Sequence, residues 1–344
     1  MPGTPKLAVV IPCYNYESFV ERAILSVVDQ TEDDCEVVVV DDGSTDNSWD
    51  AIERTGVRAF RIENGGARMA CLYGFDKTTA PFVLFLDADD ELKPGSIDQI
   101  IKLLDPNVAK LQFSLSLIDA QGRDMNGPLS TLECFRSRER LAKKVLRSGV
   151  YKSPPTSGNV FRRDVVELLR EASYDKFVDG ITLFAAPFVG DVVSTSQELG
   201  RYRIHGRNDS GLGRLPNAAT LERDLGWFLN RMEHLRKVVQ RFRPGAELVD
   251  PRKTFYFRER KLLLDIISGR RPGAAALPGL LSRLAREELG AKGKTILAVF
   301  FILAAILPSS KSKVLLAYRL KAGRRSISAF AKEMLGFGGP GMAS

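Results

Sequence analysis

The chain has 344 residues, of which 44% are hydrophobic and 27% charged, and this mixture excludes a wholly disordered or collagen-like protein. Its four cysteines lie far apart and it has only two histidines, which gives no zinc or disulfide framework and suits a reducing compartment. The net charge of +8 is unevenly distributed: residues 1–105 have 9 basic and 20 acidic residues, and residues 201–344 have 28 basic and 11 acidic ones. This asymmetry predicts that the acidic N-terminal part binds a cation or a polar ligand and that the basic C-terminal part binds an anionic partner.

Short β-branched runs alternate with helical patterns over the first 105 residues. Strands are predicted at 7–11, 36–40, 57–62 and 82–86, and helices at 19–30, 44–55 and 66–78, the second capped by Ser44 or Asp46. This alternation predicts an α/β fold with a mainly parallel sheet flanked by helices on both faces. In such sheets ligands bind beyond the carboxyl ends of the strands.

The rest of the chain divides into a mixed part and a helical part. The mixed part has strand patterns at 109–118, 191–195 and 201–204, helix patterns at 137–146, 164–170 and 180–188, and a loop at 153–158. From about residue 216 the pattern is helical, with one apolar stripe running from Leu221 to Phe242. We therefore expect a domain at 1–213, with halves at 1–105 and 106–213, and a basic helical region at 214–344.

Two acidic clusters lie where the sheet predicts a ligand. Asp41 and Asp42 follow the second strand, and Asp87, Asp89 and Asp90 follow the fourth. Either cluster alone could be a turn that caps the next helix. Together, the mutual repulsion of these carboxylates favours a site for Mg²⁺ or Mn²⁺ with a diphosphate. The sequence has neither a G-x-G-x-x-G nor a P-loop motif, which disfavours a dinucleotide fold and a P-loop ATPase.

Four sequence blocks carry a family resemblance. They are Val9-Val-Ile-Pro-Cys-Tyr-Asn15, Val39-Val-Asp-Asp-Gly-Ser-Thr-Asp46, Asn64-Gly-Gly66 and Leu86-Asp-Ala-Asp-Asp90. In order and spacing they resemble glycosyltransferase family 2, over residues 6–105 and more weakly to about 212. The resemblance implies a GT-A fold and a metal-dependent, inverting transferase. It would move a sugar from a nucleotide sugar, with UDP favoured, to a glycan or lipid-linked acceptor in surface polysaccharide or glycoconjugate synthesis.

The resemblance also implies roles for residues of the nucleotide pocket. Pro12 and Tyr14 would line the pocket for the base, and Asp42 would hydrogen-bond the base or ribose. In the Asn64-Gly-Gly block the family often has a second Asn where this chain has Leu72. Arg68 is the candidate to compensate by reaching the base or the phosphates, and its alternative is a solvated side chain.

Other residues would bind the metal and perform the chemistry. Asp87 and Asp89 match the family's DXD motif, which holds the metal and the diphosphate. Asp179, in Phe177-Val-Asp-Gly180, is placed like the family's general base, although it could simply belong to a turn. His205, in Tyr202-Arg-Ile-His205, is either a third metal-site residue or a structural histidine.

Two predictions for the middle of the chain each have an alternative. Arg203 and Arg207 are candidate phosphate contacts, although surface arginines are commoner. Pro155-Thr-Ser-Gly-Asn159 resembles the family's acceptor-side segment, and its alternative is a plain loop.

The alternative functions are a nucleotidyltransferase and a non-catalytic nucleotide-binding partner at the membrane. The first would need a Gly- and Arg/Lys-rich loop after the first strand, and the acidic residues argue against the second.

The tail contains an apolar run at 296–307, which is about 18 Å long as a helix and thus too short for a bilayer core of about 30 Å. Residues 292–325 carry eight Lys or Arg and no acid, which suits an anionic membrane surface. The alternative is a buried helix in a small helical domain. No recognised motif supports nucleic-acid binding. Since Pro12 ends the apolar run at 7–11 before a signal sequence could form, we expect a cytoplasmic protein. The basic tail extends this expectation to a peripheral position on the cytoplasmic face of the membrane.

Overall fold

The computed structural model describes residues 4–31, 33–129, 131–176, 178–206, 208 and 217–320. The chain forms two compact units, and each is described by itself. The first comprises Met1–Arg207 and Asn230–Leu248, and the second comprises Asn208–Leu229 and Val249–Ser344. The predicted boundary at residue 213 lies outside the described residues.

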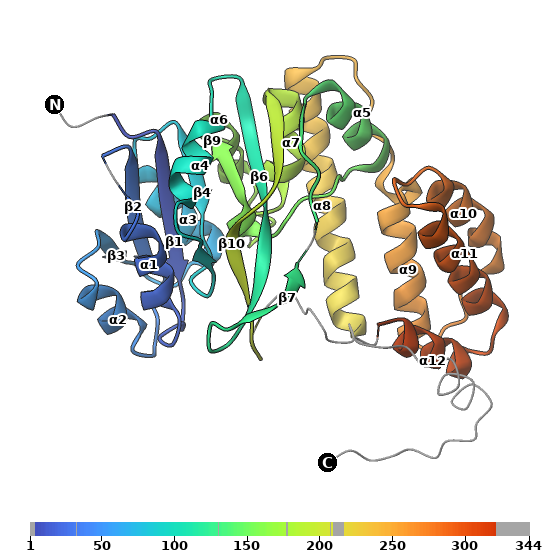
Figure 1. The fold of residues 1–344 in the computed structure, drawn as a ribbon. Helices are drawn as coiled ribbons and strands as arrows, with labels where there is room; N and C mark the ends of the chain where they lie inside the picture. The colour runs from blue at the N-terminus through green and yellow to red at the C-terminus, as the bar shows by residue number, and fades with distance from the viewer. Residues whose placement is uncertain are drawn as a thin grey trace, which may run out of the picture. The chain divides into compact units, whose positions relative to one another are not determined.

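One sheet organises the first unit (Figure 1). Its strands are β1 (Leu7–Cys13), β2 (Cys35–Asp41), β3 (Ala59–Arg61), β4 (Phe82–Phe85), β5 (Glu91–Leu92), β6 (Val108–Asp119), β7 (Asp124–Pro128), β8 (Phe135–Ser137), β9 (Asn159–Arg162) and β10 (Asp191–Ile204). Their order is β3-β2-β1-β4-β9-β6-β10-β5, with β7 on β6 and β8 on β10.

Strand direction divides this sheet into two parts. The strands β3, β2, β1 and β4 are parallel, which confirms the predicted parallel arrangement for the first 105 residues. In the other part β9 lies antiparallel between β4 and β6, while β6 and β10 are parallel. The two strands predicted at 191–195 and 201–204 are one strand, β10, whose register shifts between Thr195 and Gly200.

Helices account for most of the remaining described residues. They are α1 (Val20–Val28), α2 (Ser48–Arg54), α3 (Ala67–Asp76), α4 (Ser96–Lys102), α5 (Glu139–Ser148), α6 (Arg163–Val166), α7 (Ile181–Val189), α8 (Ala218–Phe242), α9 (Phe255–Ile267), α10 (Leu277–Ala285), α11 (Ala291–Ile306) and α12 (Ser309–Leu320). The N-cap of α2 is Asn47, so the predicted caps Ser44 and Asp46 are wrong. Asp46 still accepts a hydrogen bond from the Ser48 amide at 3.0 Å.

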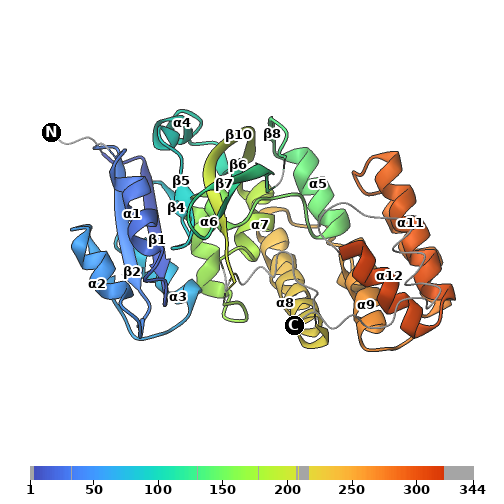
Figure 2. The ribbon, with the colours of Figure 1, turned by 60° about the horizontal axis from the view of Figure 1, so that its bottom comes forward.

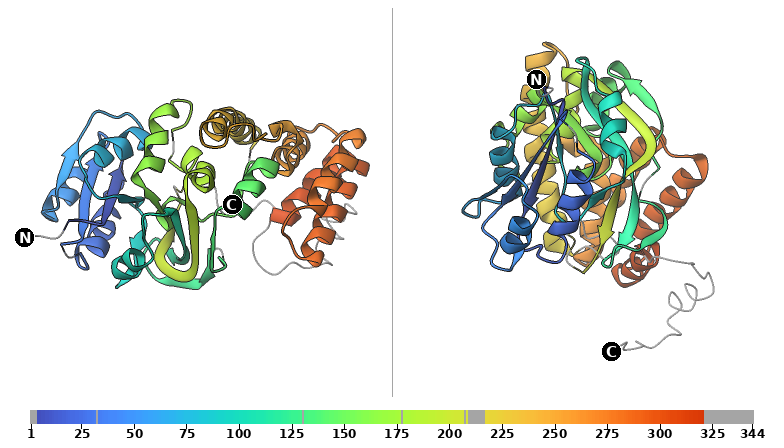
Figure 3. Two further views of the ribbon diagram at one scale, coloured as in Figure 1. Left: turned by 90° about the horizontal axis from the view of Figure 1, so that it is seen from above. Right: turned by 60° about the vertical axis from the view of Figure 1, so that its left-hand side comes forward.

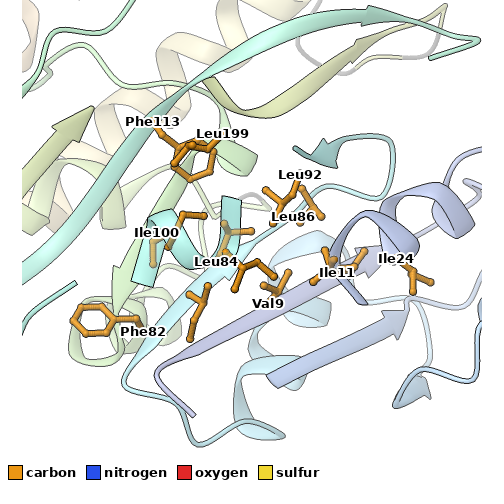
Figure 4. Packing of buried hydrophobic residues seen from close by; sticks show 14 of the residues in the cluster. Val9, Ile11, Ile24, Phe82, Leu84, Leu86, Leu92, Ile100, Phe113 and Leu199 are labelled. Atoms are coloured by element: carbon orange, nitrogen blue, oxygen red, sulfur yellow. The ribbon is translucent and has the colours of Figure 1, made fainter. Parts of the chain in front are cut away.

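Helices cover both faces of the parallel strands (Figure 2). Successive side chains of each strand point to opposite faces and so pack against the helices on both sides. Val9 and Ile11 of β1 belong to the main core together with Ile24 of α1 (Figure 4). Val10 points to the opposite face, where α3 approaches so closely that a Cβ added at Gly74 would lie 2.4 Å from the Val10 Cγ1. This two-sided burial explains why β1 consists of apolar residues without polar alternation.

The second unit is helical, and within it α9, α10, α11 and α12 are in contact (Figure 3). Its core contains Leu280, Phe300, Phe301 and Leu316, which are buried among neighbouring aliphatic side chains. None of the helices that the structure describes is long and apolar enough to cross a membrane.

The contact between α3 and β1 gives a first prediction. Replacing Gly74 with Ala should lower the free energy of unfolding by about 1–3 kcal/mol, because the added methyl group overlaps Val10. Urea denaturation followed by circular dichroism measures this change. The matched control is Gly226→Ala in α8, where no atom lies within 4 Å of the new Cβ. It should be neutral or stabilising by up to about 1 kcal/mol, and equal effects of the two substitutions would contradict the prediction.

Candidate active site

The carboxyl ends of the parallel strands bring the two acidic clusters to one edge of the sheet. Asp42 follows β2, and its amide donates to the Cys13 carbonyl at the end of β1 at 2.8 Å. Leu86 follows β4, and its amide donates to the Val10 carbonyl at 3.0 Å, so Asp87 emerges at the same edge. The predicted location of the site follows directly from this parallel register.

Asp42 organises the turn that contains the predicted Asn64-Gly-Gly block. Its two carboxylate oxygens accept hydrogen bonds from the amides of Gly65 and Gly66, both at 2.8 Å. The side chain is buried. A carboxylate has further lone pairs, so these bonds hold the turn and leave acceptor capacity for the predicted base or ribose contact, which stays a prediction.

The loop after β1 borders the same edge. Pro12 is partly buried within the strand, whereas Tyr14 is exposed. Asn15 adopts a left-handed backbone conformation (φ 59°), which Asn tolerates better than most residues. Its amide donates to Ser44 Oγ at 2.9 Å, and its side-chain oxygen accepts from the Thr45 amide at 2.8 Å. Two loops expected to line the nucleotide pocket are thereby fixed to each other.

Ser157 braces the acidic turn that follows β4. Its hydroxyl accepts from the Asp87 amide at 3.2 Å and donates to Asp90 Oδ2 at 2.6 Å. The other oxygen of Asp90 accepts from the Arg203 amide at 2.9 Å. Asp90 is buried with both oxygens bonded, so it acts as an internal brace of the turn.

Asp89 and His205 meet in the structure, although they are far apart in the sequence. His205 Nε2 lies 2.8 Å from Asp89 Oδ2, and the His205 ring packs against Phe19 with the centroids 4.9 Å apart. Arg203 supports this pair, since its Nε donates to the Asp89 carbonyl at 2.7 Å. Arg203 is fully buried and also pairs with Glu91, which does not fit the proposed contact with a phosphate.

The donor set of this turn fits a divalent cation that has a phosphate as co-ligand. Among the residues described, no three His, Cys, Asp or Glu side chains converge closely enough to hold a metal ion by themselves. Mg²⁺ sites commonly use one or two carboxylates together with substrate phosphates, and Mn²⁺ also favours oxygen. Asp87 and Asp89 meet that requirement, while the predicted set of Asp87, Asp89 and His205 stays a prediction.

Asp179 lies directly before α7, with Gly180 as the N-cap residue. Thr156 Oγ1 donates to Asp179 Oδ1 at 2.5 Å. Burial is the main cause that raises the pKa of Asp179 above its ordinary value. The Thr156 hydrogen bond and the charge of Lys110 act in the opposite direction. Asp179 is thus a partly buried carboxylate that accepts a hydrogen bond from the neutral Thr156 hydroxyl, a setting that suits a base.

The buried thiol of Cys71 shows that the carboxylates of three segments share one region. Burial raises the pKa of Cys71 well above its ordinary value, and the charges of Asp87, Asp179 and Asp42 raise it further. Burial likewise raises the pKa of Asp87, followed by the charges of neighbouring carboxylates, including Asp179. The structure therefore brings the predicted diphosphate side and the predicted base side together.

Lys110 of β6 is a polar residue near the site that the sequence did not single out. It is completely buried, and its ammonium donates to Gln112 Oε1 at 2.9 Å, Ser153 Oγ at 2.8 Å and Tyr151 OH at 3.2 Å. Burial lowers the pKa of Lys110 well below its ordinary value, and the charge of Asp179 opposes that effect. Through Ser153, Lys110 anchors the loop that carries Thr156.

Arg68 connects α3 to the segment at residues 169–175 through two side-chain hydrogen bonds. Its Nε donates to the Asp175 carbonyl at 3.0 Å and its Nη1 donates to the Leu169 carbonyl at 3.1 Å. These bonds tie α3 to the segment that precedes Asp179, and the predicted contact with the nucleotide stays a prediction. Of the other predicted positions, Phe177, Arg207 and residues 209–210 lie outside the described residues.

The comparisons with known proteins point to one family. Residues 8–166 match the model of glycosyl transferase family 2. Over 215 residues the chain is 34% identical to an uncharacterised glycosyltransferase of Nostoc sp., covering 59% of this chain and 66% of that protein. Over 129 residues it is 30% identical to the GalNAc(5)-diNAcBac-PP-undecaprenol beta-1,3-glucosyltransferase of Campylobacter jejuni, covering 34% of this chain and 40% of that enzyme.

The fold has a counterpart among solved structures. The chain is similar to residues 1–349 of S. aureus TarS, crystallised in complex with UDP-GlcNAc, with a TM-score of 0.50 and 15% sequence identity. The likeness covers 93% of both chains. At this low identity it supports the predicted α/β fold of the GT-A type and nothing further.

The bracing by Ser157 gives a second prediction. Replacing Ser157 with Ala should lower the free energy of unfolding by about 1–3 kcal/mol, because the buried Asp90 carboxylate loses a donor. Thermal and urea unfolding measure the change. The control is Ser173→Ala at an exposed position of the same unit, which should shift stability by less than about 0.5 kcal/mol. Equal shifts for the two variants would show that the bond to Asp90 contributes nothing.

Proposed function

Since residues 8–166 belong to glycosyltransferase family 2, we propose that the chain transfers a sugar from a nucleotide-diphosphate sugar to an acceptor hydroxyl with inversion at the anomeric carbon. The observation that carries this proposal is that two adjacent hydroxyls bond both acidic groups: Thr156 bonds Asp179, and Ser157 bonds the Asp87 amide and Asp90. The acidic turn after β4 would bind the diphosphate of the sugar donor, and Asp179 would activate the acceptor hydroxyl.

We assign the nucleotide of the sugar donor to the segments at the ends of β1 and β2. Tyr14 is exposed directly after β1, where its ring would stack on a base, and Pro12 lies two residues earlier, within the strand. Asp42 keeps acceptor capacity for a base or ribose donor. A UDP-sugar is the favoured donor, on the grounds of the family resemblance.

Asp87 and Asp89 are the residues we propose to hold Mg²⁺ or Mn²⁺ with the diphosphate, and His205 orients Asp89. When bound, the ion would offset the negative charge that develops on the departing diphosphate. Ser157 and the Arg203 amide each bond one oxygen of Asp90, so we assign Asp90 to holding the turn.

Asp179 is the proposed general base. It takes the proton of the acceptor hydroxyl while that oxygen forms a bond to the anomeric carbon and the bond from this carbon to the diphosphate oxygen breaks. Attack and departure on opposite faces invert the configuration. Thr156 holds Asp179 in place. The raised pKa of Asp179 strengthens it as a base and keeps its protonation equilibrium nearer to neutral pH.

The acceptor is proposed to be a glycan or a lipid-linked saccharide, in surface polysaccharide or glycoconjugate synthesis. Support comes from the name of the Campylobacter jejuni relative, which specifies an undecaprenol-linked acceptor. The loop that carries Thr156 precedes β9, and we assign it to the acceptor side because it contacts the proposed base.

The direct test is turnover of a panel of UDP-, GDP- and dTDP-sugars with Mg²⁺ or Mn²⁺. One donor should release nucleoside diphosphate, and EDTA should abolish the release. Asp89→Ala should lower kcat/KM by at least about a hundredfold, since it removes a proposed metal ligand. The control Asp98→Ala, an exposed carboxylate of α4, should leave turnover unchanged. Failure to bind any nucleotide sugar, measured by calorimetry, would overturn the proposal.

A further prediction concerns the base. Activity should fall as the pH drops through the pKa of Asp179, because only the unprotonated carboxylate accepts a proton. That pKa is raised, so the acidic limb should lie above the range of an ordinary Asp. Thr156→Val removes a hydrogen bond that lowers the pKa, and should therefore move the acidic limb of kcat to higher pH.

Thr31→Val, beyond the C-terminal end of α1, serves as the control for this measurement and should leave the pH profile unchanged. Asp179→Asn should lower kcat by about 10²- to 10⁴-fold, as expected for loss of a general base. An acidic limb that is identical in wild type and Thr156→Val would contradict the assignment of Asp179.

A further inference from the structure

The helix α11 has two apolar faces, and only one of them lies in the core of the helical unit. Phe300, Phe301 and Ala304 on the inner face are at most 5% exposed. The outer face is exposed and carries five large aliphatic side chains, which are Ile296, Val299, Ile302, Leu303 and Ile306. At 100° per residue these five positions cover one side of the helix, opposite to the buried residues.

This outer face is a concentrated patch. In the part of the chain that the structure describes, five of the eleven exposed large hydrophobic side chains belong to it. Their exposed fractions run from 36% at Leu303 to 62% at Ile306. Single exposed apolar residues are ordinary on protein surfaces, whereas a contiguous group on one helix face marks an interaction site.

The charged residues of α11 and α12 are all basic, whereas Glu287 and Glu288 precede α11. Lys292 lies four residues before Ile296 and thus on the same side of α11. Lys311 and Lys313 are exposed in the first turns of α12. Arg271 lies at the other end of the face, where its guanidinium donates to the carbonyls of Ala305 and Ile306. Residues 289–320 contain no Asp or Glu.

We propose that the outer face of α11 docks the chain on the surface of an anionic lipid bilayer. The inner face of α11 packs in protein, so the helix would lie along the interface with its aliphatic side chains among the acyl chains. The surrounding Lys and Arg side chains would reach the lipid phosphates, since their long stems can extend past apolar neighbours. The charge pattern favours this partner over an uncharged protein surface. The proposal does not depend on the transfer reaction.

Flotation of the full chain with vesicles tests the proposal. Vesicles of phosphatidylcholine with phosphatidylglycerol should bind it, while phosphatidylcholine alone should bind it more weakly, and salt should reduce the difference. The combined variant Ile296→Gln, Val299→Gln and Ile306→Gln should lower binding by at least about tenfold. Removing the charges with Lys292→Ala, Lys311→Ala and Lys313→Ala should cost about fivefold per lysine.

Two controls match these variants in number and chemistry. Leu25→Gln, Met125→Gln and Phe242→Gln remove three exposed apolar side chains elsewhere, and Lys102→Ala, Lys143→Ala and Lys237→Ala remove three exposed charges elsewhere. Both controls should bind vesicles like the wild type, and circular dichroism should show unchanged helix content in all variants.

Three outcomes would overturn the proposal. The wild type could fail to bind the mixed vesicles, or the α11 variant could bind them as tightly as the wild type. Alternatively, the wild type could be a dimer without vesicles and the α11 variant a monomer, in which case a second copy covers the face. If the α11 variant failed to fold, the comparison between the lysine variants and their control would still decide the question.

Discussion

Electrostatic repulsion among carboxylates is the constraint on which the arrangement at the end of β4 depends. Asp87, Asp89 and Asp90 lie within four residues there, the charge of Asp179 also acts on Asp87, and burial raises the pKa of Asp87, Asp90 and Asp179. The protein meets this cost with local donors. Ser157 and the Arg203 amide hold Asp90, His205 meets Asp89, and Thr156 holds Asp179. The negative charge that these hydrogen bonds leave uncompensated favours the binding of a cation. A cation bound there would in turn attract the diphosphate of a nucleotide sugar.

The parts of the fold that were predictable from the sequence are those in which the pattern is local. The apolar runs that became β1, β2 and β4 are buried on both faces, so composition alone identified them, and their ends located Asp42 and Asp87. Lys110 was not predictable in this way. In β6 it alternates with apolar residues, together with Gln112 and Ser114, and such alternation normally indicates a solvent-exposed face. The structure buries both faces.

Long-range hydrogen bonds account for the rest of what the sequence left open. Thr156 and Ser157 looked like ordinary loop residues, because their partners are 23 and 67 residues away in the chain. Similarly, the burial of Arg203 is a result of its pairing with Glu91, more than a hundred residues earlier. Residue type and spacing can suggest an acidic site, but they do not reveal which neutral side chains support it.

The adjacency of Thr156 and Ser157 has a consequence for how this chain can diverge. One hydroxyl holds the proposed base and the next holds the acidic turn, while Asn159 fixes the loop by donating to the Pro154 and Pro155 carbonyls. An insertion or deletion of one residue between Ser153 and Asn159 would move one hydroxyl by about 3.8 Å, more than a hydrogen bond tolerates. Homologous chains that retain both contacts should therefore conserve the length of this segment even where its sequence drifts, whereas loops elsewhere on the surface are free to grow.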